Sequence, residues 1–415
     1  MDTKRLDSCL CCGNTRLKPV LDLGAQPLAN SYTESMLDDT THYPLGINLC
    51  EDCWHAQLTV CVDRTAIFES YSYLSGTSNT LIQYFAWFAQ ALKDCIPKQA
   101  RVLEIAANDG SLIHQLQKVN VDVLGIDPAE NIVESAQLKG LPIIQGFWPA
   151  IAKEIEGKFD AIICMNVVAH VDNPGQFIGA CMQKLNPHGF ILVQPSQARM
   201  FGNMEFDTCY HEHLSFFNNS SIRAMAERYG LKLFDSFLVK IHGDSPVYIL
   251  GLPDSPPDFQ KIKQAFSVGD FAIAEDLAAY ENAIRLYTCE TYTQFQQSAK
   301  NTINNLRDVI TAHRSQGFDI AFVGAAAKAM TVINSAKVSP DYFFDEAPLK
   351  IGRYPPGLKI KVSALSECSK LQNKTLFIIT AWNFKDELVN KIVKLGVPTE
   401  SKFYTYFPQA AFLSL

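Results

Sequence analysis

The stretch Val102-Leu-Glu104-Ile-Ala-Ala-Asn108-Asp109-Gly110-Ser-Leu decides the fold, because it joins an apolar strand, a turn of small and polar residues, and a helix start. A second apolar run, Val121–Ile126, leads directly into Asp127. A carboxylate ~20 residues after the first turn is placed to accept hydrogen bonds from two ribose hydroxyls. The stretch therefore predicts the first half of an open α/β sheet that binds a ribose-containing ligand.

The same alternation of strand and helix continues along the middle of the chain. Short β-branched runs separated by helical patterns indicate βαβ units, and so a parallel sheet with helices on both faces. These runs are Arg101–Ile105, Val121–Ile126, Ala161–Met165 and Phe190–Val193. A second α/β block follows, from Asp319–Gly324 through Thr375–Thr380 to the end.

Three domains are expected. Residues 1–68 are rich in cysteine and turn residues, and residues 69–253 carry the first α/β alternation. The adjacent prolines in Leu252–Pro257 cannot continue a helix or a ladder, so they mark a linker. Residues 254–415 then begin with a mostly helical region, Asp258–Gln316, before the second α/β block.

The composition limits the classes of protein that the chain can belong to. Of 415 residues, 47% are hydrophobic, 19% are charged, and the formal net charge is −7. This balance supports buried cores and argues against a protein that grips nucleic-acid phosphates. The polar start and the lack of ~18 uninterrupted apolar residues predict no signal peptide and no membrane span. We expect a cytoplasmic protein.

The cysteines cluster near the start of the chain. Cys9 and Cys12 form one C-x-x-C pair, and Cys50 and Cys53 form another. Four thiolates suit tetrahedral zinc, and a closed four-thiolate site is structural rather than catalytic. The alternatives are ordinary reduced cysteines, or a set in which His55 replaces one thiol.

The first turn favours one class of ribose-containing cofactor. It reads E-x-A-A-N-D-G rather than G-x-G-x-x-G, so the glycines that cradle a pyrophosphate are missing. Acidic Glu104 and polar Asn108 suit a cationic ligand, which favours S-adenosylmethionine over NAD. In the alternative interpretation, Glu104 caps a helix in an unrelated α/β domain.

Two further segments carry polar side chains that can move protons. Asn166 and His170 follow the strand at Phe159–Met165, at the edge where such sheets bind ligands. The run Tyr210-His-Glu212-His213 combines a phenol, a carboxylate and two imidazoles, and so offers a general base and an oxyanion donor. The spacing is not H-E-x-x-H, which argues against a zinc protease. The alternatives are a structural histidine and a solvated loop.

With these motifs in place, the chain resembles the C-methyltransferases that act on nucleotide-linked keto-deoxysugars, over nearly its whole length. The motifs that carry the resemblance, besides the two cysteine pairs, are Leu21–Asn30, Ala56–Leu58, Tyr71–Ser78, Glu104–Gly110, Tyr210–His213, Gly324–Lys328, Gly352–Gly357 and Ala381–Asn383. The resemblance implies a zinc-binding domain, a Rossmann-like domain that binds S-adenosylmethionine, and a C-terminal Rossmann-like domain that closes over the sugar nucleotide. It also implies methylation of C3 beside a C4 ketone through an enolate.

The resemblance assigns roles to particular residues. It implies His213 as the base, Glu212 as its partner, and Tyr210, His170 and Tyr73 as residues near the reacting centre. The cofactor would meet Glu104, Asn108, Asp109, Asp127, Gly146, Phe147, Asn166 and Ser78. The substrate would meet Lys328, Arg353 and His242, with Lys328 at a helix start suited to a diphosphate. From the sequence alone, Lys328 and Arg353 fit a second interpretation equally well, namely that they are surface cations.

The chain departs from its relatives in ways that affect the substrate. Asp244 stands where they usually have glycine, the basic residue expected soon after His242 is absent, and Gln194 stands where they often have an acid. Two alternative functions are an NAD-dependent oxidoreductase or epimerase acting on a nucleotide-sugar, and a C-methyltransferase for another keto acceptor. A third is a non-catalytic binding module. We expect the partner to be a small molecule, a nucleotide-sugar such as a thymidine-diphosphate-linked keto-deoxysugar. We expect the protein to be a monomer or a weak homo-oligomer.

Overall fold

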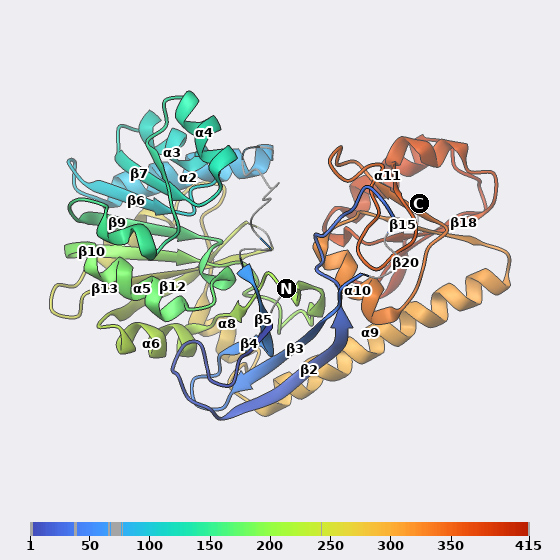
Figure 1. Cartoon of the computed structure of the whole chain (residues 1–415), viewed down its shortest axis with the longest axis horizontal. Helices are drawn as coiled ribbons and strands as arrows, with labels where there is room; N and C mark the ends of the chain where they lie inside the picture. Colours follow the sequence, from blue (N-terminus) through green and yellow to red (C-terminus); the bar gives the residue numbers. More distant parts are fainter. Residues whose placement is uncertain are drawn as a thin grey trace.

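The fold was examined in a computed structural model, which describes residues 3–36, 40–64, 67, 76, 78–241 and 243–413. Two of the predicted site residues, Tyr73 and His242, lie outside the described residues. Three larger sheets organise the chain, and Figure 1 shows them side by side, with the N-terminal sheet below and between the other two. No helix in the described part of the chain is long and apolar enough to cross a membrane.

The central sheet has eight strands in the order β14-β12-β13-β10-β9-β6-β7-β8. Neighbours from β10 to β8 pair in parallel, whereas β13 is antiparallel to both β10 and β12. Its strands are β6 (Arg101–Ile105), β7 (Asp122–Asp127), β8 (Ile143–Gln145), β9 (Phe159–Met165), β10 (Leu185–Gln194), β12 (Lys232–Val239), β13 (Ser245–Gly251) and β14 (Ile273–Asp276). The predicted α/β fold class is confirmed.

Helices cover both faces of the central sheet because its strands are apolar on both sides. In β9, Ala161 and Ile163 join one core while Ile162 and Cys164 join the other, as the two-residue period of a strand requires. The first face carries α2 (Asn79–Cys95), α3 (Ser111–Lys118), α4 (Glu130–Leu138) and α7 (Phe259–Ala265). The second carries η2 (Ala150–Lys153), α5 (Pro174–Gln183), α6 (Asn219–Arg228) and α8 (Leu277–Ala283).

The N-terminal sheet is antiparallel, with the order β11-β4-β3-β2. Its strands are β2 (Leu17–Gln26), β3 (Tyr43–Cys50), β4 (Ala56–Leu58) and β11 (Ser215–Phe216), and a separate pair joins β1 (Thr3–Arg5) to β5 (Val60–Val62). Strand β11 comes from far along the chain and begins two residues after His213. Strand β4 of the N-terminal sheet is therefore hydrogen-bonded to β11, the strand that directly follows the Tyr210–His213 segment.

The C-terminal sheet is a second, mostly parallel α/β sheet, with the order β17-β16-β15-β18-β19-β20. Its strands are β15 (Asp319–Val323), β16 (Tyr342–Asp345), β17 (Val362–Ala364), β18 (Thr375–Ile379), β19 (Lys402–Thr405) and the antiparallel β20 (Ala411–Leu413). The long α9 (Cys289–Ser315) and α10 (Ala327–Ala336) cover one face. The 3-10 helix η5 (Leu365–Lys370) and α11 (Lys385–Lys394) cover the other.

One hydrophobic core joins the N-terminal and C-terminal sheets. It contains Leu45 and Ile47 of β3, Phe206 of the 3-10 helix η4 (Phe206–Thr208), and Ile320 and Phe322 of β15. The predicted helical region after residue 258 holds α7, α8 and α9, but it also holds β14, which pairs with β12 at the edge of the central sheet.

Candidate functional site

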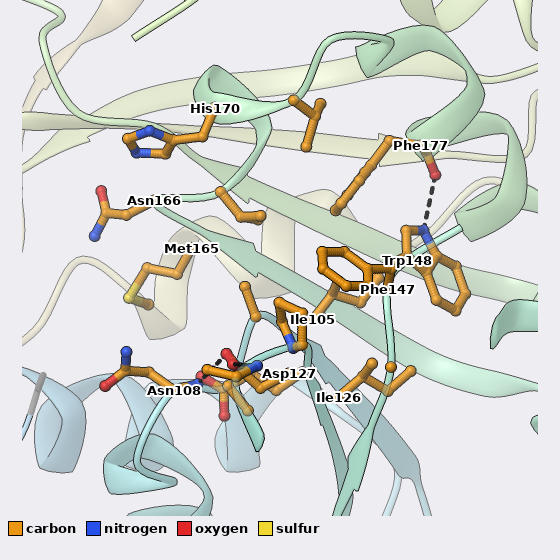
Figure 2. A pocket seen from close by; sticks show the side chains of 18 of the residues that line it. Ile105, Asn108, Ile126, Asp127, Phe147, Trp148, Met165, Asn166, His170 and Phe177 are labelled. Atoms are coloured by element: carbon orange, nitrogen blue, oxygen red, sulfur yellow. Dashed lines mark hydrogen bonds between the residues drawn. The ribbon is translucent and has the colours of Figure 1, made fainter. Parts of the chain in front are cut away.

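A cavity of about 320 Å³ lies at the carboxyl ends of the central strands. Figure 2 shows His170 and Asn166 at one end, Phe147 and Trp148 at the other, and Asn108 with Asp127 along one side. Loops after β6, β7, β8 and β9 form its walls, as expected for a ligand site in an open α/β sheet. Its lining includes Arg64, Leu81, Phe85, Glu104, Ile105, Asn108, Ile126, Asp127, Gly146, Phe147, Met165, Asn166, His170 and Asp172.

Asp127 holds the turn after β6 in place. Its carboxylate accepts hydrogen bonds from the backbone N–H groups of Asn108, at 2.8 Å, and Ala129, at 3.0 Å. Asn108 has a left-handed backbone with a φ of 50°, which asparagine tolerates better than most residues. Burial raises the pKa of Asp127, although the two backbone donors oppose this change. The predicted neighbourhood of Glu104, Asn108 and Asp127 is thus assembled on one wall.

Glu104 is a buried acid with an unused oxygen. Its side chain is 5% exposed, and Oε2 has no hydrogen-bond partner among the described residues. Burial raises the pKa of Glu104 well above its usual range, and the charges of Asp127 and Asp109 raise it further. An unpartnered carboxyl group costs free energy, which a bound cation or hydrogen-bond donor would recover. The wall therefore fits a ligand that carries positive charge and hydroxyl groups.

The end of the cavity near Phe147 is suited to a flat apolar group. Phe147 is 60% exposed and lines the cavity together with Ile126. Gly146 has no room for a side chain, because a Cβ atom would lie 2.3 Å from Ile151. Asn166 also lines the cavity, with a φ of 52°, and its buried Oδ1 has no partner within the described structure. Such a mixture of aromatic surface and a few polar atoms is typical of a nucleoside site.

Two of the predicted cofactor residues lie outside the cavity lining. Ser78 is the N-cap of α2 and accepts a hydrogen bond from the backbone N–H of Leu81, at 3.4 Å. Asp109 accepts from the backbone N–H of Gly76, at 2.8 Å, and from the hydroxyl of Ser111, at 2.7 Å. Both side chains shape the backbone around the cavity in this structure.

His213 lies in a second polar cluster beside the cavity. Its Nδ1 atom is 2.9 Å from the carbonyl oxygen of Thr208, and its Nε2 atom is 2.8 Å from the phenol of Tyr210. The side-chain amide of Gln197 also contacts Nδ1. A carbonyl can only accept, whereas this amide can turn its Oε1, which has no other partner among the described residues, toward Nδ1. Nδ1 therefore carries the proton and Nε2 accepts the O–H of Tyr210. Burial lowers the pKa of His213 well below its usual range, and the charges of His170, Lys328 and Arg64 act in the same direction. The imidazole is therefore a neutral base near pH 7.

His170 connects this cluster to the cavity. It lines the cavity, and its ring centre lies 5.0 Å from that of His213. Its Nδ1 donates to the backbone carbonyl of Glu212 at 2.9 Å, and burial lowers its pKa to about 4. The side chain of Glu212 instead accepts from the amide of Asn30, at 2.6 Å. In this geometry the carboxylate of Glu212 meets the N-terminal domain's Asn30, and the described partners of His213 are Tyr210, Thr208 and Gln197.

The two predicted substrate cations are placed differently. Lys328 lies at the start of α10, with its ammonium 3.8 Å from the carboxylate of Glu205 and 5.2 Å from the ring centre of Trp382. Its charge reaches His213 and contributes to the lowered pKa there. Arg353 pairs with Glu34, at 3.5 Å. The structure therefore brings Lys328, but not Arg353, to the His213 cluster.

Three residues of this cluster were not found from the sequence. Gln197 and Thr208 contact Nδ1 of His213. Arg64 lines the cavity and donates to the backbone carbonyls of His211, at 2.9 Å, and Glu212, at 3.0 Å. The Arg64 contacts reach backbone carbonyls 147 and 148 residues away, and the contacts of Gln197 and Thr208 depend on how the loop around His213 folds, so no periodic sequence pattern could have indicated them.

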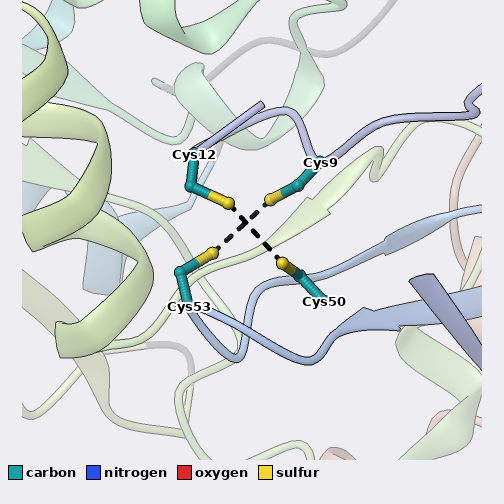
Figure 3. Close-up of side chains that lie close together, drawn as sticks. All are labelled: Cys9, Cys12, Cys50 and Cys53. Carbon is teal, nitrogen blue, oxygen red and sulfur yellow. Dashed lines mark hydrogen bonds between the residues drawn. The ribbon is translucent and has the colours of Figure 1, made fainter. Parts of the chain in front are cut away.

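The four predicted metal ligands lie together, as Figure 3 shows. Their sulfur atoms all lie within 4.8 Å of one another, and the pairs Cys9–Cys53 and Cys12–Cys50 are 3.5 Å apart. Tetrahedral zinc with Zn–S bonds of ~2.3 Å needs sulfur atoms ~3.8 Å apart, so the cluster fits such an ion. His55 is buried nearby with Nε2 3.2 Å from the hydroxyl of Ser215 and is not in this group.

Comparison with known proteins connects all three regions. The family model described as a putative zinc binding domain matches residues 9–68, and that of a methyltransferase domain matches 79–235. The model of the C-methyltransferase C-terminal domain matches residues 270–408. The C-methyltransferase NovU of Streptomyces niveus is 23% identical over 397 residues, which cover 93% of this chain and 92% of that protein. The three matches follow one another along the chain as a zinc-binding domain, a methyltransferase domain and a C-methyltransferase C-terminal domain. The chain is therefore an S-adenosylmethionine-dependent methyltransferase with a zinc-binding domain, whose four clustered cysteines form the zinc site.

Two further similarities each cover less than half of this chain. The ubiquinone biosynthesis O-methyltransferase of Caulobacter sp. (strain K31) is 32% identical over 101 residues, or 22% of this chain and 39% of that protein. A solved S-adenosylmethionine-dependent methyltransferase from Clostridium acetobutylicum has 14% identity and a TM-score of 0.33, covering 41% of this chain and 92% of that one.

Proposed function

We propose that this C-methyltransferase methylates C3 of a nucleotide-linked 4-keto-deoxysugar through an enolate that His213 generates. The proposal draws on the resemblance of the sequence motifs and on the match to NovU along 93% of the chain. The observation that carries it is the Tyr210–His213 pair, which lies against His170 at one end of the cavity. A ketone acidifies the neighbouring C–H bond, so a buried neutral imidazole is a suitable base for it.

We assign the cavity to the cofactor. The free lone pairs of Asp127 would accept the ribose hydroxyls, and Glu104 would face the cationic amino-acid end. Phe147 and the backbone of Gly146 would meet the adenine, and Asn108 and Asn166 would complete the polar contacts. When bound there, S-adenosylmethionine supplies a methyl group on a sulfonium, which is open to attack by a carbon nucleophile.

The residues of the second cluster then divide the proton chemistry. The proton of the substrate carbon moves to Nε2 of His213 while the phenol of Tyr210 turns to donate to the developing enolate oxygen. The carbonyl of Thr208 stabilises the imidazolium through Nδ1–H. After carbon–carbon bond formation, the imidazolium releases its proton to water and the phenol returns to Nε2. His170 and the Glu212–Asn30 pair would border the sugar.

The nucleotide part of the substrate needs a cation. We propose that Lys328, which is near the cluster and has a side chain 32% exposed, meets the diphosphate. Arg353, Tyr73 and His242 remain predicted substrate neighbours, and the division into domains at residues 68/69 and 253/254 also stays a prediction. The four clustered thiolates would hold zinc in a closed structural site, consistent with the putative zinc binding domain.

The test compares His213→Gln with His114→Gln, an exposed histidine on α3. His213→Gln should lower the rate of methyl transfer to a thymidine-diphosphate-linked 4-keto-deoxysugar by at least ~10³-fold, because the base is lost. It should also stop exchange of the C3 proton in D₂O, while calorimetry finds the same affinity for S-adenosylmethionine. His114→Gln should match the wild type in all three measurements. Activity of His213→Gln within tenfold of wild type would exclude His213 as the base.

A further inference from the structure

The carboxyl ends of β15 and β18 are the position where the C-terminal sheet would bind a ligand. The chain leaves β15 through α10 toward β16 on one side, and β18 pairs with β15 on the other. Such a reversal of strand order is the topological switch point at which open α/β sheets bind ligands. The loops that follow these two strands are residues 324–326, which lead into Lys328 of α10, and residues 380–381, which lead into the 3-10 helix η6 (Trp382–Phe384).

These two loops are closed onto each other. The hydroxyl of Thr380 donates to the carbonyls of Val323, at 2.7 Å, and Gly324, at 2.6 Å. A Cβ atom on Gly324 would lie 2.3 Å from the Cβ of Ala381, and the φ of Gly324 is 103°. Only glycine fits this contact, so the two loops meet directly at Gly324 and Ala381.

A segment of the chain's own middle part, Glu205–Cys209, binds to the outer side of these loops instead. The indole N–H of Trp382 donates to the carboxylate of Asp207 at 2.8 Å, and the hydroxyl of Thr331 on α10 donates to the carbonyl of Cys209 at 3.0 Å. Lys328 lies 3.8 Å from Glu205, and the rings of Phe206 and Phe407 meet edge to face with centres 5.7 Å apart. Trp382, Lys328 and Thr331 belong to the loop after β18 and to α10, and Phe407 follows β19. All four residues that contact the segment therefore come from the C-terminal region.

Asp207 is a buried acid beside these loops. Its side chain is fully buried, and Oδ1 has no partner among the residues that the structure describes. Burial raises the pKa of Asp207 to about 6, while Lys328 and the indole of Trp382 oppose this rise. The carboxylate thus lies within the field of Lys328, the cation at the start of α10.

The next residue after Asp207 contacts the base. The carbonyl of Thr208 accepts Nδ1–H of His213 at 2.9 Å, and this bond decides that Nε2 is the basic nitrogen. We propose that Trp382 and Asp207 form a latch by which the C-terminal domain positions the Thr208 carbonyl and so fixes the tautomer and orientation of His213. This inference rests on the proposed role of His213 as base. Trp382 and Asp207 are positioning residues, since they act through Thr208.

The test uses Trp382→Phe in the full-length protein, with Trp87→Phe as the matched control. Both substitutions remove one indole donor. Trp382 donates to Asp207, whereas Trp87 on α2 donates to the carbonyl of Val268 at 2.6 Å and does not contact the Glu205–Cys209 segment in any described hydrogen bond. The first readout is NMR of protein labelled with ¹⁵N at histidine, with the His213 signals assigned through His213→Gln. In Trp382→Phe the Nδ1–H proton of His213 should shift and exchange with water at least ~10-fold faster, because its acceptor is no longer fixed.

The second readout is kinetic. Trp382→Phe should lower kcat for methyl transfer about tenfold, with the affinity for S-adenosylmethionine unchanged by calorimetry. Asp207→Asn retains an oxygen for the indole and should keep the NMR signal near that of the wild type, whereas Asp207→Ala should resemble Trp382→Phe. Trp87→Phe should match the wild type in both readouts.

The outcomes separate the latch from the proposed function. If wild-type protein transfers no methyl group to any nucleotide keto-deoxysugar tried, the proposed function fails, and the NMR comparison still decides on the latch. If Trp382→Phe leaves the shift and exchange rate of the His213 N–H as in the wild type, the latch is disproved. Since Trp382 is only half-buried, a folded Trp382→Phe protein is expected even if Asp207→Ala fails to fold.

Discussion

At the scale of single residues, burial leaves both an acid and a base in their neutral forms. Glu104 has a pKa raised by desolvation and by Asp127 and Asp109, whereas His213 has a pKa lowered by desolvation and by nearby positive charge. In each case, burial removes the water that would solvate the charged form, so the neutral form is favoured. A neutral carboxyl group can therefore ionise when a cation arrives, and a neutral imidazole can accept a proton.

Glu104 gives a prediction about proton release. S-adenosylmethionine should favour the carboxylate of Glu104, so binding should release a proton and tighten as pH rises until Glu104 ionises in the free protein. Calorimetry in buffers of different ionisation enthalpy measures this release directly. Glu104→Gln should abolish it and weaken binding by about tenfold or more, because a charged partner is lost.

The matched control is Glu134→Gln, which changes an exposed acid on α4. It should release the same proton as the wild type. A binding heat that does not depend on the buffer in the wild-type protein would contradict the assignment of Glu104.

Lys328 gives a prediction about pH dependence. His213 must be neutral to act as base, so the rate should fall as pH drops through its pKa, which lies below ~6.5. The groups that lower this pKa besides burial are His170, Lys328 and Arg64, and the Thr208 carbonyl opposes them. Lys328→Met removes one positive charge, so the pKa of His213 should rise and the acidic limb of the kcat profile should move to higher pH.

The measurement is the pH at half-maximal kcat, supported by NMR titration of His213. Lys394→Met, which removes an exposed cation on α11, should leave this midpoint unchanged. A midpoint that stays constant or falls in Lys328→Met would show that Lys328 does not act on the base through its charge.

At the scale of secondary-structure elements, the short pairing of β4 with β11 connects the cysteine cluster to the base. Strand β4 begins at Ala56, three residues after Cys53 of the second thiol pair, and Ala56 pairs with Phe216 of β11. The backbone of Leu214, the residue after His213, accepts from Leu58 at 3.0 Å and donates to Ala169 at 2.8 Å. A two-residue strand is too short to be stable alone, so its position depends on the fold of the thiol cluster.

Metal removal tests this dependence. Cys50→Ser should lower the zinc content from one ion per chain and lower the thermal midpoint by at least ~5 °C, because metal binding contributes folding free energy. Hydrogen exchange should become faster in β4 and β11. Cys289→Ser, which changes an exposed cysteine on α9, should leave zinc content and exchange unchanged. Unaltered exchange in β11 after loss of zinc would show that this strand is held without the metal.

At the scale of the whole molecule, all three regions meet at the segment Glu205–Leu214. Arg64 and Asn30 bind it from the N-terminal region, Ala169 and His170 from the central region, and Trp382, Thr331 and Lys328 from the C-terminal region. The core shared by the N-terminal and C-terminal sheets makes these two regions one packing unit. We therefore expect them to unfold together.

Tyr32 is a direct link between those two regions. Its phenol donates to the carbonyl of Ala325 at 2.7 Å, and Thr33 and Tyr354 form a bridge beside it. Tyr32→Phe should cost about 1 kcal/mol, since Lys350 still donates to the same carbonyl and keeps it satisfied. Differential scanning calorimetry should show one joint transition for both regions, shifted down by ~2–4 °C in the variant.

Tyr229→Phe is the control, because Tyr229 lies at the end of α6 beside the central sheet and outside the shared core. It should leave the joint transition in place. Two separate transitions for the N-terminal and C-terminal regions in the wild-type protein would contradict the shared core.

The sequence by itself determined the features that depend on near neighbours in the chain. The apolar run Ala161–Met165 between helical patterns indicated a strand with helices on both faces. The turn Glu104–Gly110 with Asp127 indicated the cavity wall, and the spacing of the cysteines indicated the thiol cluster. Each pattern is local, because backbone geometry converts it into the same structure in many chains.

The tertiary structure alone decided how the base is held. The sequence suggested Glu212 as the partner of His213, but Glu212 meets Asn30, 182 residues away, and the proton on Nδ1 is set by Thr208. Trp382 reaches Asp207 across 175 residues, and Arg64 reaches the Glu212 carbonyl across 148. Contacts of this kind involve single side chains and backbone carbonyls, which leave no periodic pattern in a sequence, so only the packing of three regions on one segment determines them.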